Sequence, residues 1–140
     1  MGGINVFRWI LSGIVSGTLF FLIEGLASQF YHRQMEASLQ RLGLSMEMSA
    51  QTMLWALLVS LIAGLSLVFF YAAARPRFGP GPRTAFIVAT ALFCGGYLLS
   101  LIGYHMMGMF PLRLLIHWGL VGYLETVLVT IVGAWIYREE

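Results

Sequence analysis

Residues 50–74 read AQTMLWALLVSLIAGLSLVFFYAAA and contain no charged side chain. A helix needs about 20 mostly apolar residues to cross the hydrocarbon core of a bilayer. The stretch is long enough, and its side chains do not alternate between apolar and polar as they would in a strand of a membrane barrel. It therefore predicts a membrane-spanning α-helix.

Three further stretches have the same character, at residues 6–31, 84–107 and 112–137. Across the chain 59% of residues are hydrophobic and 10% are charged, whereas about 25% are charged in an ordinary soluble domain. A soluble chain of this length would expose much of that apolar surface to water. The short connections predict an all-α, integral membrane four-helix bundle in up-down-up-down order, with residues 1–140 as one transmembrane domain.

Proline marks the ends of the two short connections. Arg75-Pro76 is expected to end the second span near residue 74, because proline lacks the amide donor and disfavours helix in the residue before it. The third span is expected to begin at Pro82 or Thr84, since proline is favoured in the first turn of a helix. Pro111 marks the turn between the third and fourth spans.

The arginines near the span ends are divided unequally between the two sides of the predicted bundle. Five lie on the side of the termini and three on the opposite side. Positive charge favours the cytoplasmic side of a membrane, so we expect both termini to be cytoplasmic, in a bacterial inner membrane. The first group is Arg8, Arg75, Arg77, Arg83 and Arg138, and the second is Arg33, Arg41 and Arg113.

The longest connection, residues 32–49, has an amphipathic pattern. Met35, Leu39 and Leu42 recur at helical spacing, with charged and amide side chains on the other faces. Gly43 then offers a helix end. The pattern predicts a short amphipathic helix on the outer side, which either lies on the membrane surface or extends the first span.

Small residues recur at four-residue intervals in three of the spans. Such spacing lets helix backbones approach closely in lipid, either within the bundle or between two copies of the chain. The residues are Ser12 with Ser16, Gly13 with Gly17, Ser60 with Gly64, and Gly122 with Thr126 and Thr130.

The loop RPRFGPGPRT at residues 75–84 and the ending GAWIYRE at residues 133–139 accompany a glutamate in the first and last spans. With these features the chain resembles a group of small, uncharacterised bacterial membrane proteins that have four helices. The resemblance covers most of the chain. It implies no activity.

Glu24 and Glu125 stand inside predicted spans, where a charged residue costs about 2.5–3.5 kcal/mol. By helical rise, Glu125 lies near the middle of the bilayer and Glu24 in the outer half, with His117 above them. Intramembrane Glu and His residues relay protons or hold a cation, so we expect these three to form a polar ladder. The alternative is structural: a protonated glutamate bonded to a neighbouring Ser, Thr or backbone carbonyl would hold helices together.

Histidines and methionines gather on the predicted outer side of the bundle. His105 and His117 stand at similar depth on either side of the turn between the third and fourth spans. Thioether and imidazole ligands suit Cu(I), and two facing imidazoles suit haem b. The alternative is that the methionines are apolar packing residues at irregular hairpin ends. A metal or haem site would use His105, His117, Met106, Met107 and Met109.

Arg75, Arg77 and Arg83 form a basic loop that is expected to contact lipid headgroups and fix the orientation. The sequence has no phosphate-binding loop, zinc-protease motif or serine-nucleophile motif, and its net charge of +2 does not indicate nucleic-acid binding. The leading hypothesis is a non-enzymatic accessory protein that self-associates or joins a larger membrane complex. Two alternatives stay open: a proton or cation carrier or sensor that uses the buried glutamates, and a haem b or Cu(I) binder at the outer membrane face.

Overall fold

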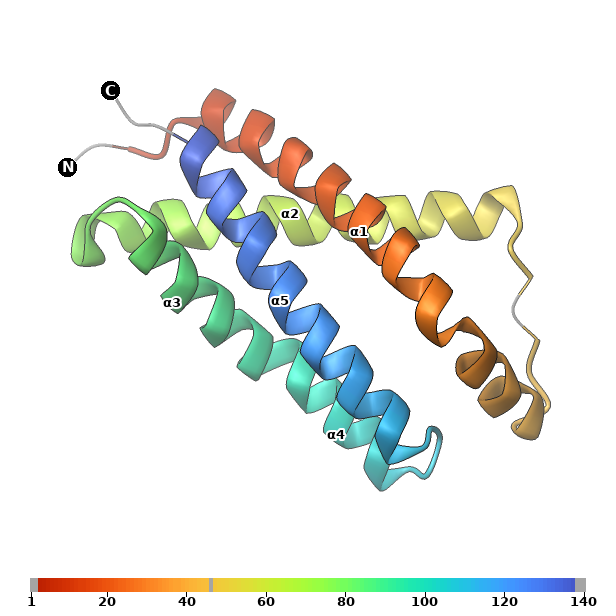
Figure 1. Cartoon of the computed structure of the whole chain (residues 1–140). Coiled ribbons are helices and arrows are strands. Elements are labelled where there is room, and N and C mark those ends of the chain that lie inside the picture. Colours follow the sequence, from red (N-terminus) through yellow and green to blue (C-terminus); the bar gives the residue numbers. More distant parts are fainter. Residues whose placement is uncertain (1–2, 46, 138–140) are drawn as a thin grey trace.

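The computed structural model describes residues 3–45 and 47–137. These residues form four helical spans that are long and apolar enough to cross a membrane (Figure 1), which confirms the predicted all-α membrane fold. The third span is made of three consecutive segments. The elements are α1 (Val6–Arg41), α2 (Ala50–Phe78), α3 (Pro82–Leu92), the π-helical segment η1 (Phe93–Tyr97), α4 (Leu98–Met106) and α5 (Leu112–Ile136). Arg138, used to predict the orientation, lies outside the described residues.

α1 is longer than the first predicted span because nothing interrupts it. Asn5 caps its start, where Asn5 Oδ1 accepts a hydrogen bond from the Arg8 amide at 3.0 Å. No proline or glycine occurs between Gly25 and Gly43, so the amphipathic segment continues the same helix to Arg41. It extends the first span, which is one of the two predicted arrangements, and forms no separate helix. Gly43 follows with a φ of 70°, the left-handed conformation that ends many helices.

α2 passes through Pro76 and ends at Phe78, beyond residue 74, where it was predicted to end. Proline removes one amide donor, and this loss is small in the last turn because few backbone hydrogen bonds follow. Gly79 closes the helix with a φ of 83°, and its amide donates to the Arg75 carbonyl at 2.8 Å. The predicted boundary was wrong because the glycine, rather than the proline, supplies the stop. Pro82 occupies the first turn of α3, as predicted.

η1 is a π-helical turn that the sequence did not predict. The amide of Leu98 donates to the carbonyl of Phe93, one residue farther back than in an α-helix. Gly95 and Gly96 lie in this turn, and glycine adapts to many backbone conformations at little steric cost. A π turn shifts the following side chains around the helix axis and is frequent at functional sites. Here the turn includes Tyr97, which lines a cavity described below.

Small residues bring the backbones of α1 and α2 into contact. A Cβ added at Gly64 would lie 2.5 Å from the Gly13 carbonyl oxygen and 2.6 Å from Gly17 Cα. Only glycine fits at such a crossing. Ser16 of α1 is fully buried, and its hydroxyl donates to the Val129 carbonyl of α5 at 3.0 Å. These small residues therefore pack helices within the chain.

The start of α1 and the end of α5 lie together at one end of the bundle (Figure 1). The Asn5 amide donates to the Tyr137 hydroxyl at 3.2 Å. The Tyr71 hydroxyl accepts a hydrogen bond from the Gly81 amide at 3.0 Å and so holds the loop between α2 and α3. A buried apolar cluster connects these contacts. Its members are Val68, Tyr71, Ala72, Ala85, Ala134 and Tyr137.

Candidate functional site

The carboxyl groups of Glu24 and Glu125 meet inside the bundle. Glu125, on α5, is 3% exposed, and its carboxyl faces that of Glu24 on α1. Glu24 is half-buried and accepts a hydrogen bond from the Tyr31 hydroxyl. The structure thus brings together two of the three residues of the predicted polar ladder and adds a tyrosine to them.

No backbone or side-chain donor reaches the Glu125 carboxyl oxygens within the part of the chain that the structure describes. The hydroxyls of Thr126 and Thr130 donate instead to carbonyls of their own helix, each at 2.6 Å. An ionised carboxylate can only accept, so two carboxyl groups hydrogen-bond to each other only when one of them carries a proton. Two carboxyl groups that face each other in this way can share a proton or hold a cation between them.

A cavity of about 350 Å³ adjoins the pair and lies between α1, η1, α4 and α5. Glu24 lines this cavity, whereas the more deeply buried Glu125 does not. The rest of the lining consists of four aromatic rings, two apolar side chains and one serine. The lining residues are Glu24, Tyr31, Met35, Tyr97, Ser100, Leu101, Tyr104 and Trp118. A ligand in the cavity would therefore reach the pair through Glu24.

Edge-to-face contacts hold the aromatic rings around the cavity. The ring centroids of Tyr31 and Trp118 are 5.8 Å apart. Those of Trp118 and Phe110 are 5.0 Å apart, and those of Phe110 and Tyr104 are 5.6 Å apart. Each such pair stabilises by about 0.5–1.5 kcal/mol beyond its buried area. The rings thus form one connected aromatic cluster contributed by α1, α4, α5 and the turn before α5.

His117 does not belong to this site, which corrects the prediction of a three-residue ladder. The side chain is exposed and lines a separate surface hollow with Arg113 and three apolar residues of α5. The face of α5 that buries Glu125 does not include His117. Depth along a helix follows from sequence position, but rotation about the helix axis is decided by packing.

The residues predicted for Cu(I) or haem b are not gathered into one site. His105 lines an apolar cavity of about 390 Å³ between α4 and α5, and His117 lies in the hollow described above. Met106 and Met107 are 81% and 74% exposed at the end of α4, and Met109 lines a third hollow. Within residues 3–45 and 47–137, no group of three His, Cys, Asp or Glu side chains could hold a metal ion. These side chains line different hollows or lie exposed, and a metal or haem site stays a prediction.

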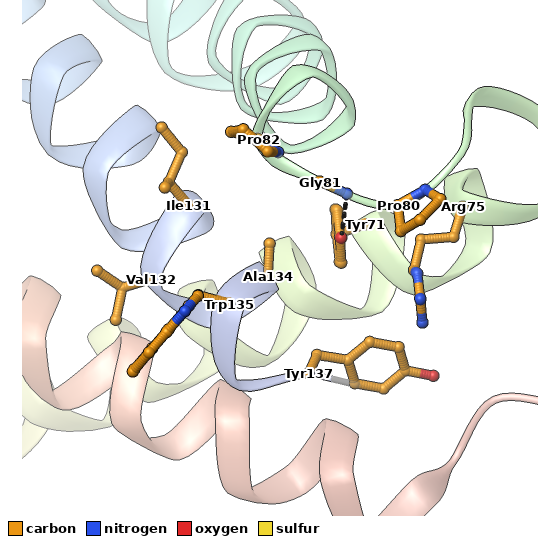
Figure 2. Close-up of a pocket in the computed structure, with 10 residues that line it drawn as sticks. All are labelled: Tyr71, Arg75, Pro80, Gly81, Pro82, Ile131, Val132, Ala134, Trp135 and Tyr137. Carbon is orange, nitrogen blue, oxygen red and sulfur yellow. Dashed lines mark hydrogen bonds between the residues drawn. The ribbon is translucent and has the colours of Figure 1, made fainter. Parts of the chain in front are cut away.

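Arg75, Arg77 and Arg83 lie at the end of the bundle where α1 begins and α5 ends. Arg77 and Arg83 are exposed. Arg75 is half-buried, and its guanidinium lies 5.7 Å from the centre of the Tyr137 ring. Figure 2 shows the Arg75 side chain extending toward Tyr137 beside a mostly apolar cavity of about 430 Å³. Contact between the two exposed arginines and lipid headgroups stays a prediction.

The aromatic residues of the cavity were not predicted as site residues. One signal was available for Tyr31, which follows Glu24 by seven residues, or about two helical turns, and therefore shares its face. No comparable signal existed for Tyr97, because its direction depends on the π turn. None existed for Trp118 either, because its direction depends on the rotation of α5.

Comparisons with protein-family models, with curated proteins and with solved structures gave no match. The four apolar helices show a multi-pass membrane protein.

Proposed function

We propose that this protein is a carrier of protons or monovalent cations, with Glu24 and Glu125 as the binding groups. One observation carries the proposal. A carboxyl that is 3% exposed faces a second carboxyl on another helix, and no hydrogen-bond donor within the described residues reaches its oxygens. Ionisable residues are costly inside a membrane and are typically retained for ion or proton handling.

The cavity gives the pair a route to its surroundings. Glu24 lines the cavity and its carboxyl faces that of Glu125, so Glu24 is the group through which a proton would reach Glu125. Tyr31 holds the Glu24 carboxyl in place through its hydroxyl. Glu125 does not line this cavity, so transport requires a second conformation that opens Glu125 to the opposite side of the membrane.

The other two hypotheses stay predictions with weaker structural support. The small-residue motifs that suggested self-association are used for packing between α1, α2 and α5. The haem b or Cu(I) residues are spread over separate hollows and exposed positions. The contact between two carboxyl groups is the feature that helix packing does not require.

Proteoliposomes test the carrier function. A pH gradient imposed across vesicles that contain the protein is expected to decay faster than one across protein-free vesicles, as read by an internal pH-sensitive dye. Glu24→Gln and Glu125→Gln are each expected to return the decay to the protein-free rate. Glutamine keeps the size of the side chain and can still hydrogen-bond, but it cannot exchange a proton.

Glu36→Gln is the matched control, because Glu36 is an exposed glutamate on the outer part of α1. This variant should transport at the wild-type rate. Gradient decay that is unchanged in the Glu24→Gln/Glu125→Gln double variant would contradict the proposed function.

We also propose that the protein lies in a bacterial inner membrane with both chain ends in the cytoplasm, since five arginines lie on that side and three on the other. Replacing Arg77 and Arg83 with glutamine leaves three on each side and is expected to produce both orientations. Fusions of alkaline phosphatase and of a fluorescent protein to the C-terminus report the two orientations. Replacing Arg33 and Arg41 instead should leave the orientation unchanged. A periplasmic C-terminus in the unaltered chain would refute the proposed orientation.

A further inference from the structure

We propose that the cavity beside Glu24 binds a lipophilic organic cation, which exchanges there for the proton of the carboxyl pair. This inference rests on the proposed function, because it names the substrate class of the same site. It is carried by the chemistry of the cavity wall and by the position of the cavity in the bundle.

The wall of the cavity combines one carboxyl group with aromatic rings. Tyr31, Tyr97, Tyr104 and Trp118 contribute the rings, and Glu24 contributes the only charged group among the lining residues. The π faces of Tyr and Trp attract cations, most strongly where water is excluded. The volume of about 350 Å³ falls within the range of small-molecule sites. A positively charged organic molecule matches this wall, whereas an anion would meet a carboxyl with no basic side chain beside it.

Calcium and magnesium ions fit the cavity less well. They take about six to eight oxygen ligands, usually from several carboxylates or carbonyls. The cavity offers one carboxyl, one serine hydroxyl and tyrosine hydroxyls. The part of the chain that the structure describes holds no cluster of three His, Cys, Asp or Glu side chains. The aromatic rings and the single carboxyl of the cavity favour an organic cation whose charge is spread over a large molecule.

The cavity lies at the side of the bundle. α1 packs against α2 and α5, and α4 packs against α5 and η1, while the described backbones of α1 and α4 do not approach each other closely. Tyr97 and Tyr104, on the α4 side of this gap, are 39% and 38% exposed. Both residues belong to a candidate membrane span, so a bilayer around the bundle would meet their exposed surface. A substrate that partitions into the bilayer therefore reaches the cavity directly.

Exchange keeps the charge of the site constant, because one monovalent cation enters as one proton leaves. The titratable groups around Glu24 come from every neighbouring wall of the cavity. They are Glu125 on α5, Tyr31 on α1, Tyr97 on η1 and Tyr104 on α4. Of these groups the carboxyl pair supplies the proton that leaves. Since protons and cations compete for one site, cation affinity is expected to fall as the pH is lowered.

Tetraphenylphosphonium is a suitable probe, and tetraphenylborate is its control because it has the same shape and the opposite charge. Equilibrium dialysis against the full chain in lipid nanodiscs measures both. We expect saturable binding of tetraphenylphosphonium, no saturable binding of tetraphenylborate, and release of one proton per bound cation in weakly buffered solution. Glu24→Gln should weaken cation binding about tenfold or more, because it removes the charge that faces the ligand.

Two substitutions at Tyr104 separate the contribution of its ring to cation binding from any effect on folding. Tyr104→Phe keeps the ring and is expected to bind within about twofold of wild type, whereas Tyr104→Leu should bind roughly three- to tenfold more weakly. Phe30→Leu is the control, since Phe30 is 87% exposed on α1 and does not line the cavity. Equal binding of the two probes, or unchanged affinity in Glu24→Gln, would overturn the proposal.

This outcome is distinguishable from failure of the carrier function. A protein that dissipates a pH gradient through Glu24 and Glu125 but does not bind tetraphenylphosphonium overturns the substrate class and leaves proton transport standing. A protein that shows neither behaviour overturns both.

Discussion

Replacing Gly64 with leucine is expected to prevent α1 and α2 from packing and to leave little folded protein. A single Cβ at this position would already lie 2.5 Å from the Gly13 carbonyl oxygen and 2.6 Å from Gly17 Cα. These are backbone atoms, which cannot turn aside as the end of a flexible side chain can, so the helices must separate. Overpacking a close contact costs about 1–3 kcal/mol and occasionally more. In lipid, that contact is itself a main source of helix association.

A matched pair of substitutions in α1 measures how much the close crossing of α1 and α2 contributes to the free energy of unfolding. Gly17→Ala would place a Cβ 2.6 Å from Leu61 Cα and 2.7 Å from the Ser60 carbonyl oxygen, and it is expected to lower the free energy of unfolding by about 1–3 kcal/mol. Gly25→Ala, farther along the helix, meets no heavy atom within 4 Å among the described residues. It should be neutral or slightly stabilising, because alanine favours helix over glycine.

Unfolding in mixed detergent micelles, followed by circular dichroism, measures the three variants against wild type. If Gly17→Ala and Gly25→Ala had equal effects, or if Gly64→Leu unfolded at the wild-type midpoint, the close crossing of α1 and α2 would be refuted.

The four spans could be predicted because the length of an apolar segment is a property of the sequence alone. The boundaries of these spans were harder to predict, since more than one nearby residue can end a helix. Pro76 was expected to stop α2, but Gly79 does so, because only the glycine readily adopts the left-handed conformation that follows. Gly43 could be recognised as the end of α1 because no proline stands near it.

The carboxyl pair could be predicted in part. A charge inside a span is costly wherever it lies, so Glu24 and Glu125 stood out from sequence. Their contact depends on how α1 and α5 are rotated, and small buried residues such as Ser16, which bonds α5 directly, set that rotation. The same rotation leaves His117 exposed. Residue spacing gives the depth of a side chain in the bilayer but does not give the direction in which it points.

The aromatic cavity could not be predicted, because four separate elements build it. Tyr97 enters its wall in a π turn, where an α-helix would have turned the following residues differently. Trp118 and Tyr104 contact Phe110, which lies in the turn before α5. The sequence shows that these residues are aromatic, while their convergence is a result of tertiary packing.

Infrared spectroscopy of the protein in lipid reports whether Glu24 and Glu125 share a proton. A protonated carboxyl has its own carbonyl stretching band, which is distinct from the bands of an ionised carboxylate and of the backbone, and whose frequency depends on hydrogen bonding. Two carboxyl groups that share a proton are coupled, so a change in either one must alter the band of the other.

The wild-type protein is expected to show one carboxylic-acid band from the pair, and Glu36→Gln should leave it unchanged. Glu125→Gln and Glu24→Gln should each remove or shift that same band, since each removes one of the two facing carboxyl groups. A band that keeps its frequency and intensity in Glu24→Gln and disappears only in Glu125→Gln would show that the two carboxyl groups do not meet.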